Sequence, residues 1–161
     1  MPPLRQSRNQ LGFTPMEVVI VLIFIGIIST IIISRSDTGR TDLLAQTAVI
    51  KSHIRYAQSR AMNADRSWGF RCDDSGQRYW LFVDGDPDNK RTLPGEVTDT
   101  VDLTRYKLAL TTIAFSFDSR GRPCSDANGE DLLGSDLSLT LSAGAGAIQA
   151  ITITRNTGFI P

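Results

Sequence analysis

Glu17 is a single carboxylate at the start of an otherwise apolar run, Val18–Ile33. From Phe13 to Ile33 the chain has 21 residues. A helix of that length is about 31 Å long, close to the thickness of the hydrocarbon core of a membrane. A carboxylate in a membrane costs roughly 2.5–3.5 kcal/mol at the centre and less near the interface. Glu17 therefore requires a cationic partner, which the membrane itself does not supply.

A second group of acidic residues, Asp84, Asp86 and Asp88, alternates along the chain as ligands do at the start of a calcium loop. The glutamate that closes such a loop is missing, because the twelfth position is Gly95. Turn chemistry explains the same residues with fewer assumptions. These aspartates are therefore only a weak calcium candidate, and we predict no metal or other cofactor.

The two cysteines, Cys72 and Cys124, both follow the apolar run. An even number of cysteines in a translocated domain predicts one disulfide, with two separate buried thiols as the alternative. His53 is the only histidine, and we expect it at the surface or at the boundary of the core. It has no recognisable catalytic partners, so we predict that the protein is not an enzyme.

The chain of 161 residues is long enough for one membrane segment and one modest domain. Its 17 basic and 17 acidic residues balance, which makes nucleic acid unsuitable as a main partner. The leader, Met1–Gly12, contains Arg5 and Arg8 but no acid. Such a leader is expected on the cytoplasmic side of a membrane.

Beyond the apolar run, the spacing of hydrophobic residues along the chain changes twice. Residues 34–64 predict an amphipathic helix, whose apolar face steps by three and four residues through Leu43, Thr47, Ile50, Ile54, Ala57 and Ala61. From residue 65 the period is two, which predicts antiparallel strands, with a hairpin turn at 74–76 and another at 143–147. In the strand at 77–84, Tyr79, Leu81 and Val83 compete with Trp80 and Phe82 for the helix-facing side.

The sequence Gly12-Phe13-Thr14-Pro15-Met16-Glu17, with a basic leader before it and an apolar run after it, resembles the class III signal of type IV pilins and type II secretion pseudopilins. The resemblance implies that a prepilin peptidase cleaves between Gly12 and Phe13 and N-methylates Phe13. It also implies that the helix leaves the inner membrane for a filament core. There, Glu17 would pair with the Phe13 ammonium of a neighbouring subunit.

Three further segments resemble the GspH/FimT group of minor pilins and pseudopilins: Gln58–Ala61, Phe115–Pro123 and Ile151–Gly158. This resemblance implies an α+β pilin fold, in which a long N-terminal helix packs against an antiparallel β-rich domain. The helix has a transmembrane half, 13–33, and an amphipathic half, 34–64, and the β-rich domain covers 65–161. After removal of residues 1–12, the C-terminal domain is expected in the periplasm of a single-pass protein of the bacterial inner membrane.

The same resemblance implies a low-copy structural subunit that helps to initiate a type IV pilus or a type II secretion pseudopilus, or that sits near its tip. Its partners would be the prepilin peptidase and other major and minor pilins or pseudopilins. The alternative is a minor pilin that binds DNA for uptake. Some members of the group bind DNA through a basic C-terminal segment, but here that segment offers only Arg155. Arg120 and Arg122 flank Gly121 in an internal turn, and two charges give weak phosphate affinity.

Overall fold

The computed structural model describes residues 14–34, 38–144 and 146–161, and gives only the backbone for residues 30–34 and 38. The chain divides into two units, Met1–Asp37 and Thr38–Pro161, and each is described here by itself. The described residues of the first unit form the helix α1 (Pro15–Ser34). The predicted leader and the cleavage site between Gly12 and Phe13 lie outside the described residues.

No helix among the described residues combines the length and the hydropathy needed to cross a membrane. The membrane span predicted at residues 13–33 is therefore not found. Its first residue, Phe13, lies outside the described part of the chain.

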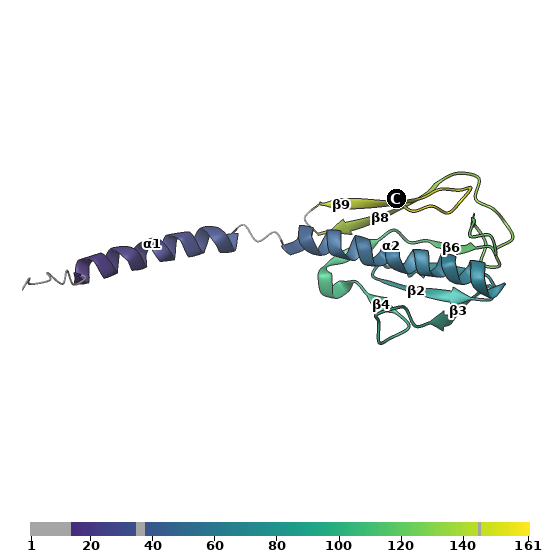
Figure 1. Cartoon of the computed structure of the whole chain (residues 1–161), viewed down its shortest axis with the longest axis horizontal. Helices are drawn as coiled ribbons and strands as arrows, with labels where there is room; N and C mark the ends of the chain where they lie inside the picture. The colour runs from purple at the N-terminus through teal and green to yellow at the C-terminus, as the bar shows by residue number, and fades with distance from the viewer. Residues whose placement is uncertain (1–13, 35–37, 145) are drawn as a thin grey trace, which may run out of the picture. The chain divides into compact units, whose positions relative to one another are not determined.

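The second unit begins with α2 (Thr38–Ala64), the amphipathic helix that the sequence predicts. All members of the predicted apolar face are at most 7% exposed: Leu43, Thr47, Ile50, Ile54, Ala57 and Ala61. In Figure 1, α2 lies lengthwise across the strands of the β-rich domain. The face packs against β1, β6, β8 and β9, which confirms the predicted packing of the helix under a sheet.

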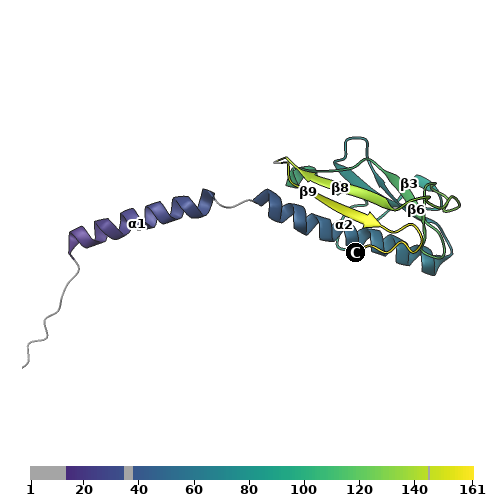
Figure 2. The ribbon, with the colours of Figure 1, turned by 90° about the horizontal axis from the view of Figure 1, so that it is seen from above.

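The strands form two antiparallel sheets. They are β1 (Trp68–Cys72), β2 (Arg78–Val83), β3 (Asp86–Arg91), β4 (Val101–Asp102), β5 (Leu108–Leu110), β6 (Ala114–Phe117), β7 (Pro123–Cys124), β8 (Leu137–Ala143) and β9 (Ile148–Ile153), with a short helix η1 (Thr104–Tyr106) before β5. The larger sheet has the order β3-β2-β1-β6-β7, with β4 also paired to β2. The smaller has the order β5-β8-β9. Figure 2 shows β8 and β9 above α2 as a hairpin.

Strand register decides which side of β2 meets the helix. Tyr79, Leu81 and Val83 pair with Cys72, Phe70 and Trp68, and all six belong to the core under α2. Phe82 faces the other way and is completely buried, because its ring covers Gly69 on β1. Trp80 stays half-buried, with its indole nitrogen donating to the carbonyl of Pro87 (2.8 Å). Strand register thus gives Tyr79, Leu81 and Val83 the helix-facing side, and Gly69 leaves room for the Phe82 ring on the opposite face.

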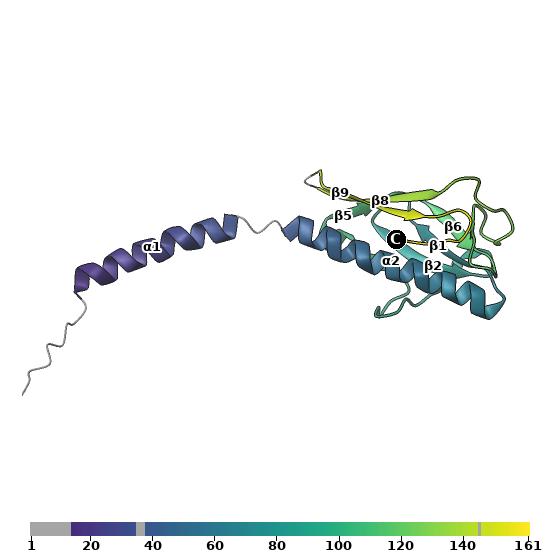
Figure 3. The same ribbon diagram turned by 45° about the horizontal axis from the view of Figure 1, so that its top comes forward.

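The C-terminal segment returns to the surface of α2, as Figure 3 shows at the label C. Ile160 is 2% exposed. Its carbonyl accepts a hydrogen bond from the Arg55 guanidinium (2.7 Å), and Lys51 Nζ donates to the carbonyl of Pro161 (2.6 Å). Side chains of α2 therefore hold this segment against the helix.

Candidate functional site

The start of α1 is built by the sequence Thr14-Pro15-Met16-Glu17. Thr14 is the residue before the helix, and its Oγ1 accepts the backbone N–H of Glu17 (3.3 Å). Its carbonyl accepts the N–H groups of Glu17 (3.0 Å) and Val18 (3.3 Å). Pro15 occupies the first helical position, where a missing N–H costs nothing. An acid in the first turn is also favoured by the helix dipole. Local chemistry thus starts the helix here and places the Glu17 carboxylate in its first turn.

From Val18 to Ile28, α1 presents an apolar surface in every direction. Its large apolar side chains from Met16 to Ile28 are between 43% and 70% exposed. Ser29 satisfies its hydroxyl within the helix, by donating to the carbonyl of Ile25 (2.7 Å). A helix that is apolar all round is stable only where other apolar groups surround it. α1 therefore exposes an apolar surface, with one carboxylate in its first turn.

A second feature joins three segments that are distant in the sequence. Gln58 Nε2 on α2 donates to the carbonyls of Gly121 (2.8 Å) and Thr157 (2.9 Å). Gly121 and Gly158 have positive φ angles of 77° and 64°. A Cβ at Gly158 would collide with Gln58 and with the Gly121 carbonyl. The segments Gln58–Ala61, Phe115–Pro123 and Ile151–Gly158, on which the pilin resemblance rests, therefore meet at one point.

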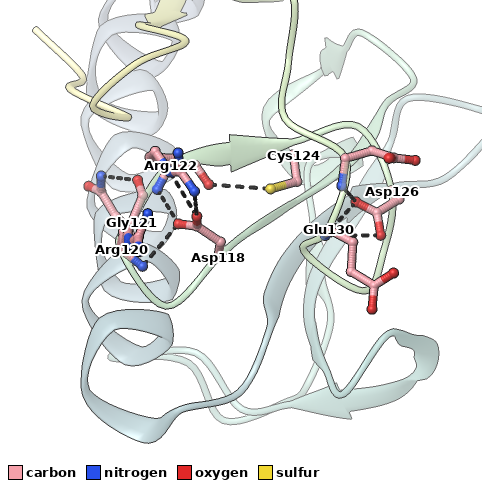
Figure 4. A network of polar contacts seen from close by, with 9 residues as sticks. Asp118, Arg120, Gly121, Arg122, Cys124, Asp126 and Glu130 are labelled. Carbon is pink, nitrogen blue, oxygen red and sulfur yellow. Dashed lines mark hydrogen bonds and ion pairs between the residues drawn. The ribbon is translucent and has the colours of Figure 1, made fainter.

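Asp118 organises the middle segment, as Figure 4 shows. Its carboxylate accepts the backbone N–H groups of Arg120 (3.0 Å) and Arg122 (2.8 Å) and pairs with the Arg122 guanidinium (2.7 Å). The carboxylate is partly desolvated, but these hydrogen bonds outweigh that and hold the pKa of Asp118 below its ordinary value. Because Asp118 engages Arg122, the Arg120-Gly121-Arg122 turn does not offer two free cations to a phosphate backbone.

No known family profile matches the sequence, and no curated protein is significantly similar to it. Among solved structures, the chain is similar to the type IV minor pilin FimU of Pseudomonas aeruginosa, at 14% identity and a TM-score of 0.54. The match covers 77% of this chain and 90% of that chain. This chain has a type IV minor pilin-like fold. The predicted α+β architecture, with a helix packed on an antiparallel β-rich domain, is thereby confirmed.

Within this pilin-like fold, the predicted disulfide is wrong, since Cys72 and Cys124 are both free and buried. Cys124 on β7 pairs with Ser116 on β6, and Ser116 pairs with Gly69 on β1. Cys124 therefore lies level with Gly69, two strands away from β1. Two strand spacings and three residues along β1 separate the two Cα atoms by more than about 12 Å, whereas a disulfide needs less than about 7 Å. The two thiols also project from opposite faces of the sheet. The alternative, two separate buried thiols, is correct.

The weak calcium candidate is not assembled by the pilin-like fold. Asp84 has a positive φ (63°) in a turn and pairs with Arg66 (3.4 Å). Asp86 and Asp88 belong to β3, where the Asp86 carboxylate accepts the Asp88 N–H (2.9 Å). No group of three or more His, Cys, Asp or Glu side chains in the described part of the chain is arranged to hold a metal ion. Turn and strand chemistry explain the spacing of these aspartates.

His53 is not at the surface, contrary to the sequence-based expectation, because it is only 2% exposed. Its Nδ1 lies 2.9 Å from the Tyr79 hydroxyl, and its Nε2 lies 3.1 Å from the carbonyl of Pro94. Burial lowers the pKa of His53, although the Pro94 bond and the charge of Glu96 oppose the shift. The imidazole therefore ties α2 to β2 and to the 93–96 turn, which is a structural role.

One feature escaped sequence reasoning altogether. A cavity of about 410 Å³ is lined by Arg60 and Ala64 of α2, by Arg66, by Trp68 and Val83 at the ends of β1 and β2, and by Arg91 at the end of β3. Its three arginines are spread over some thirty positions of the sequence. Such spacing carries no recognisable motif, because only the fold brings the ends of α2 and β3 to the same cavity.

Proposed function

We propose that this protein is a minor pilin or pseudopilin. It is a low-copy structural subunit that helps to initiate a type IV pilus or a type II secretion pseudopilus, or that sits near its tip. One observation carries the proposal: a carboxylate in the first turn of an uncovered apolar helix, α1, in a chain with a minor pilin-like fold.

The physical argument links the charge of Glu17 to the amine that the predicted cleavage creates. Association of apolar helices would cover the exposed side chains of α1 and also desolvate Glu17. A buried carboxylate without a partner is strongly destabilising, by about 3–5 kcal/mol when a pair is broken. Cleavage between Gly12 and Phe13 would create an amine at Phe13, and that cation on a neighbouring subunit would match Glu17. Processing and assembly are thereby chemically coupled.

Replacing Glu17 tests the assembly part of this proposal. The wild-type chain and Glu17→Gln are expressed in a host that makes the other pilins, and the amount of each in sheared filaments is measured. We expect Glu17→Gln to be processed normally but to enter filaments at least about tenfold less, because the Phe13 ammonium would lose its partner. Glu130→Gln, the same change at an exposed position of the globular unit, is the matched control. Normal incorporation of Glu17→Gln would remove the charge-pairing argument.

Replacing Gly12 tests the processing part. We expect the mature wild-type chain to begin at N-methylated Phe13, as read by mass spectrometry, and a bulky Gly12→Val to remain uncleaved. A trimmed Gly12→Val chain would contradict the assignment of the signal. The prepilin peptidase as a partner is a prediction that this experiment also tests, and the inner-membrane location before assembly stays a separate prediction.

DNA binding for uptake has weaker support. The turn that was its best candidate has Arg122 held by Asp118, and Arg155 Nη1 donates to the carbonyl of Gly134 (2.7 Å). Both arginines serve the fold.

A further inference from the structure

The cavity at the C-terminal end of α2 concentrates positive charge. Arg60, Arg66 and Arg91 line it, together with apolar or aromatic residues, and the lining includes no acid. Asp84 contacts one of the three guanidinium groups, at 3.4 Å from Arg66 Nε, and both side chains of that pair are largely solvated. Arg60 lies over the ring of Trp68, with Cζ 5.2 Å from the ring centroid. Three arginine side chains thus line one cavity whose lining contains no acid.

A second observation is independent of the arginines. Trp68, which lines the cavity, is only 6% exposed. Its indole nitrogen is fully buried and has no hydrogen-bond acceptor among the described residues. A buried donor without an acceptor costs about 1–3 kcal/mol. The other tryptophan, Trp80, does not share this feature, since its indole nitrogen donates to the carbonyl of Pro87.

We propose that this cavity binds a carboxylate from an acidic segment of a neighbouring pilin subunit. Guanidinium groups bind carboxylates through paired charge-assisted hydrogen bonds, and the Trp68 ring under Arg60 lies close enough to sense a carboxylate bound there. The neighbouring subunit as the source of the carboxylate rests on the proposed function.

The same geometry disfavours single-stranded nucleic acid as the occupant. Proteins that bind single strands stack bases on open aromatic faces. Here the Arg60 guanidinium lies over the Trp68 ring, and Tyr56 contacts the ring edge-on at 6.0 Å between centroids. The cavity lining also contains Val83 and Ala64, which suit the apolar stem of a glutamate.

Nuclear magnetic resonance of the full ¹⁵N-labelled chain in a non-ionic detergent tests the proposal directly. The chain has two tryptophans, so its two indole N–H signals report on the cavity and on a reference at the other face of β2. We expect a tetraglutamate peptide to shift the Trp68 signal and to leave the Trp80 signal in place. A tetraglutamine peptide should shift neither. Equal movement of both signals, or no movement of Trp68, would overturn the proposal.

Variants identify the groups responsible. Arg91→Gln leaves the Arg60–Trp68 contact intact, and we expect it to weaken peptide binding at least about fivefold; Arg60→Gln combined with Arg91→Gln should weaken it by more than about twentyfold. Arg105→Gln, an exposed arginine over Tyr106, is the control with the same charge change. Unchanged binding by the double variant would refute the site.

A thymidine oligonucleotide completes the titrations. If it shifts Trp68 at lower concentration than the peptide does, the carboxylate assignment is wrong and a nucleic acid occupies the cavity. Because the titrations use the isolated chain, their failure would leave the filament assay of Glu17→Gln untouched. Conversely, if the chain binds the peptide but never enters filaments, the cavity is a binding site and the proposed function is wrong.

Discussion

The contact between Gly69 and Phe82 gives a sharp test of how the larger sheet is built. Gly69 on β1 pairs directly with Phe82 on β2, and the Phe82 ring occupies the space in which a side chain at position 69 would lie. A Cβ added there would overlap three carbons at the edge of the ring. We therefore expect Gly69→Ala to be strongly destabilising even though it adds only one methyl group.

The magnitude follows from the burial of Phe82, which is 0% exposed. An aromatic side chain buries about 150–250 Å², so complete expulsion of the ring would cost about 4–6 kcal/mol at about 25 cal/mol per Å². Overpacking by one methyl group usually costs about 1–3 kcal/mol. Gly69 is tied to strands on both sides, to β2 and to β6, and so cannot easily move away. We expect a loss of about 3 kcal/mol.

The assay is urea unfolding of the full chain in a non-ionic detergent, followed by tryptophan fluorescence, because Trp68 and Trp80 lie in these two strands. Gly134→Ala is the control, since a Cβ at that exposed position meets nothing within 4 Å. It should change the free energy of unfolding by less than about 0.5 kcal/mol.

A compensating variant separates the contact from other effects. In a Phe82→Leu background, the smaller side chain leaves space beside position 69, and Gly69→Ala should then cost about 1 kcal/mol or less. A cost below about 1 kcal/mol in the wild-type background, or an equal cost in both backgrounds, would refute the reasoning that the ring and the glycine are a matched pair.

Two further predictions concern buried groups that titrate. Burial lowers the pKa of His53 below its ordinary value of 6.5. Because the unfolded chain then binds the proton more readily than the folded chain, the free energy of unfolding should fall as the pH drops from about 7.5 to about 5.5. His53→Gln should flatten this dependence in urea unfolding, and an unchanged slope would contradict it. Burial also raises the pKa of Cys72 to about 12 and that of Cys124 to about 11. Iodoacetamide at neutral pH should therefore modify neither thiol in the native chain and both after denaturation, as read by mass spectrometry, whereas the mass of a disulfide would be contrary evidence.

Local sequence determined the helices well, because their signals are local. The spacing of Leu43, Ile50, Ile54 and Ala57 follows the helical period, and each of these residues is buried in α2. Thr14 and Pro15 similarly specify where α1 begins, through a hydrogen bond and a missing donor within four residues. Alternation of apolar residues likewise predicted the β8–β9 hairpin and its turn, which a hydrogen bond between Ala143 N–H and the Ala147 carbonyl closes (2.8 Å).

Strand β3 shows where local signals failed. Its sequence, DPDNKR, contains polar residues and a proline and is typical of a turn, yet it pairs with β2 as Asp86–Arg91. It lies at the edge of the sheet, where a proline is tolerated and polar side chains reach solvent. Pairing with an existing strand, rather than intrinsic propensity, makes this segment extended.

Tertiary structure alone decided the features that depend on distance between elements. The cysteines pointed to a disulfide by number, but sheet order and register place them two strands apart and on opposite faces. His53 looked peripheral beside the apolar stripe, and the Tyr79 hydroxyl and the Pro94 carbonyl gave it buried partners. The arginine cavity exists only because the fold brings residues from the ends of α2 and β3 to one place. The sequence by itself determined the chemistry at the start of α1, since Glu17 and its helix cap lie within four consecutive residues; it did not determine these other sites, because their geometry depends on which strands become neighbours.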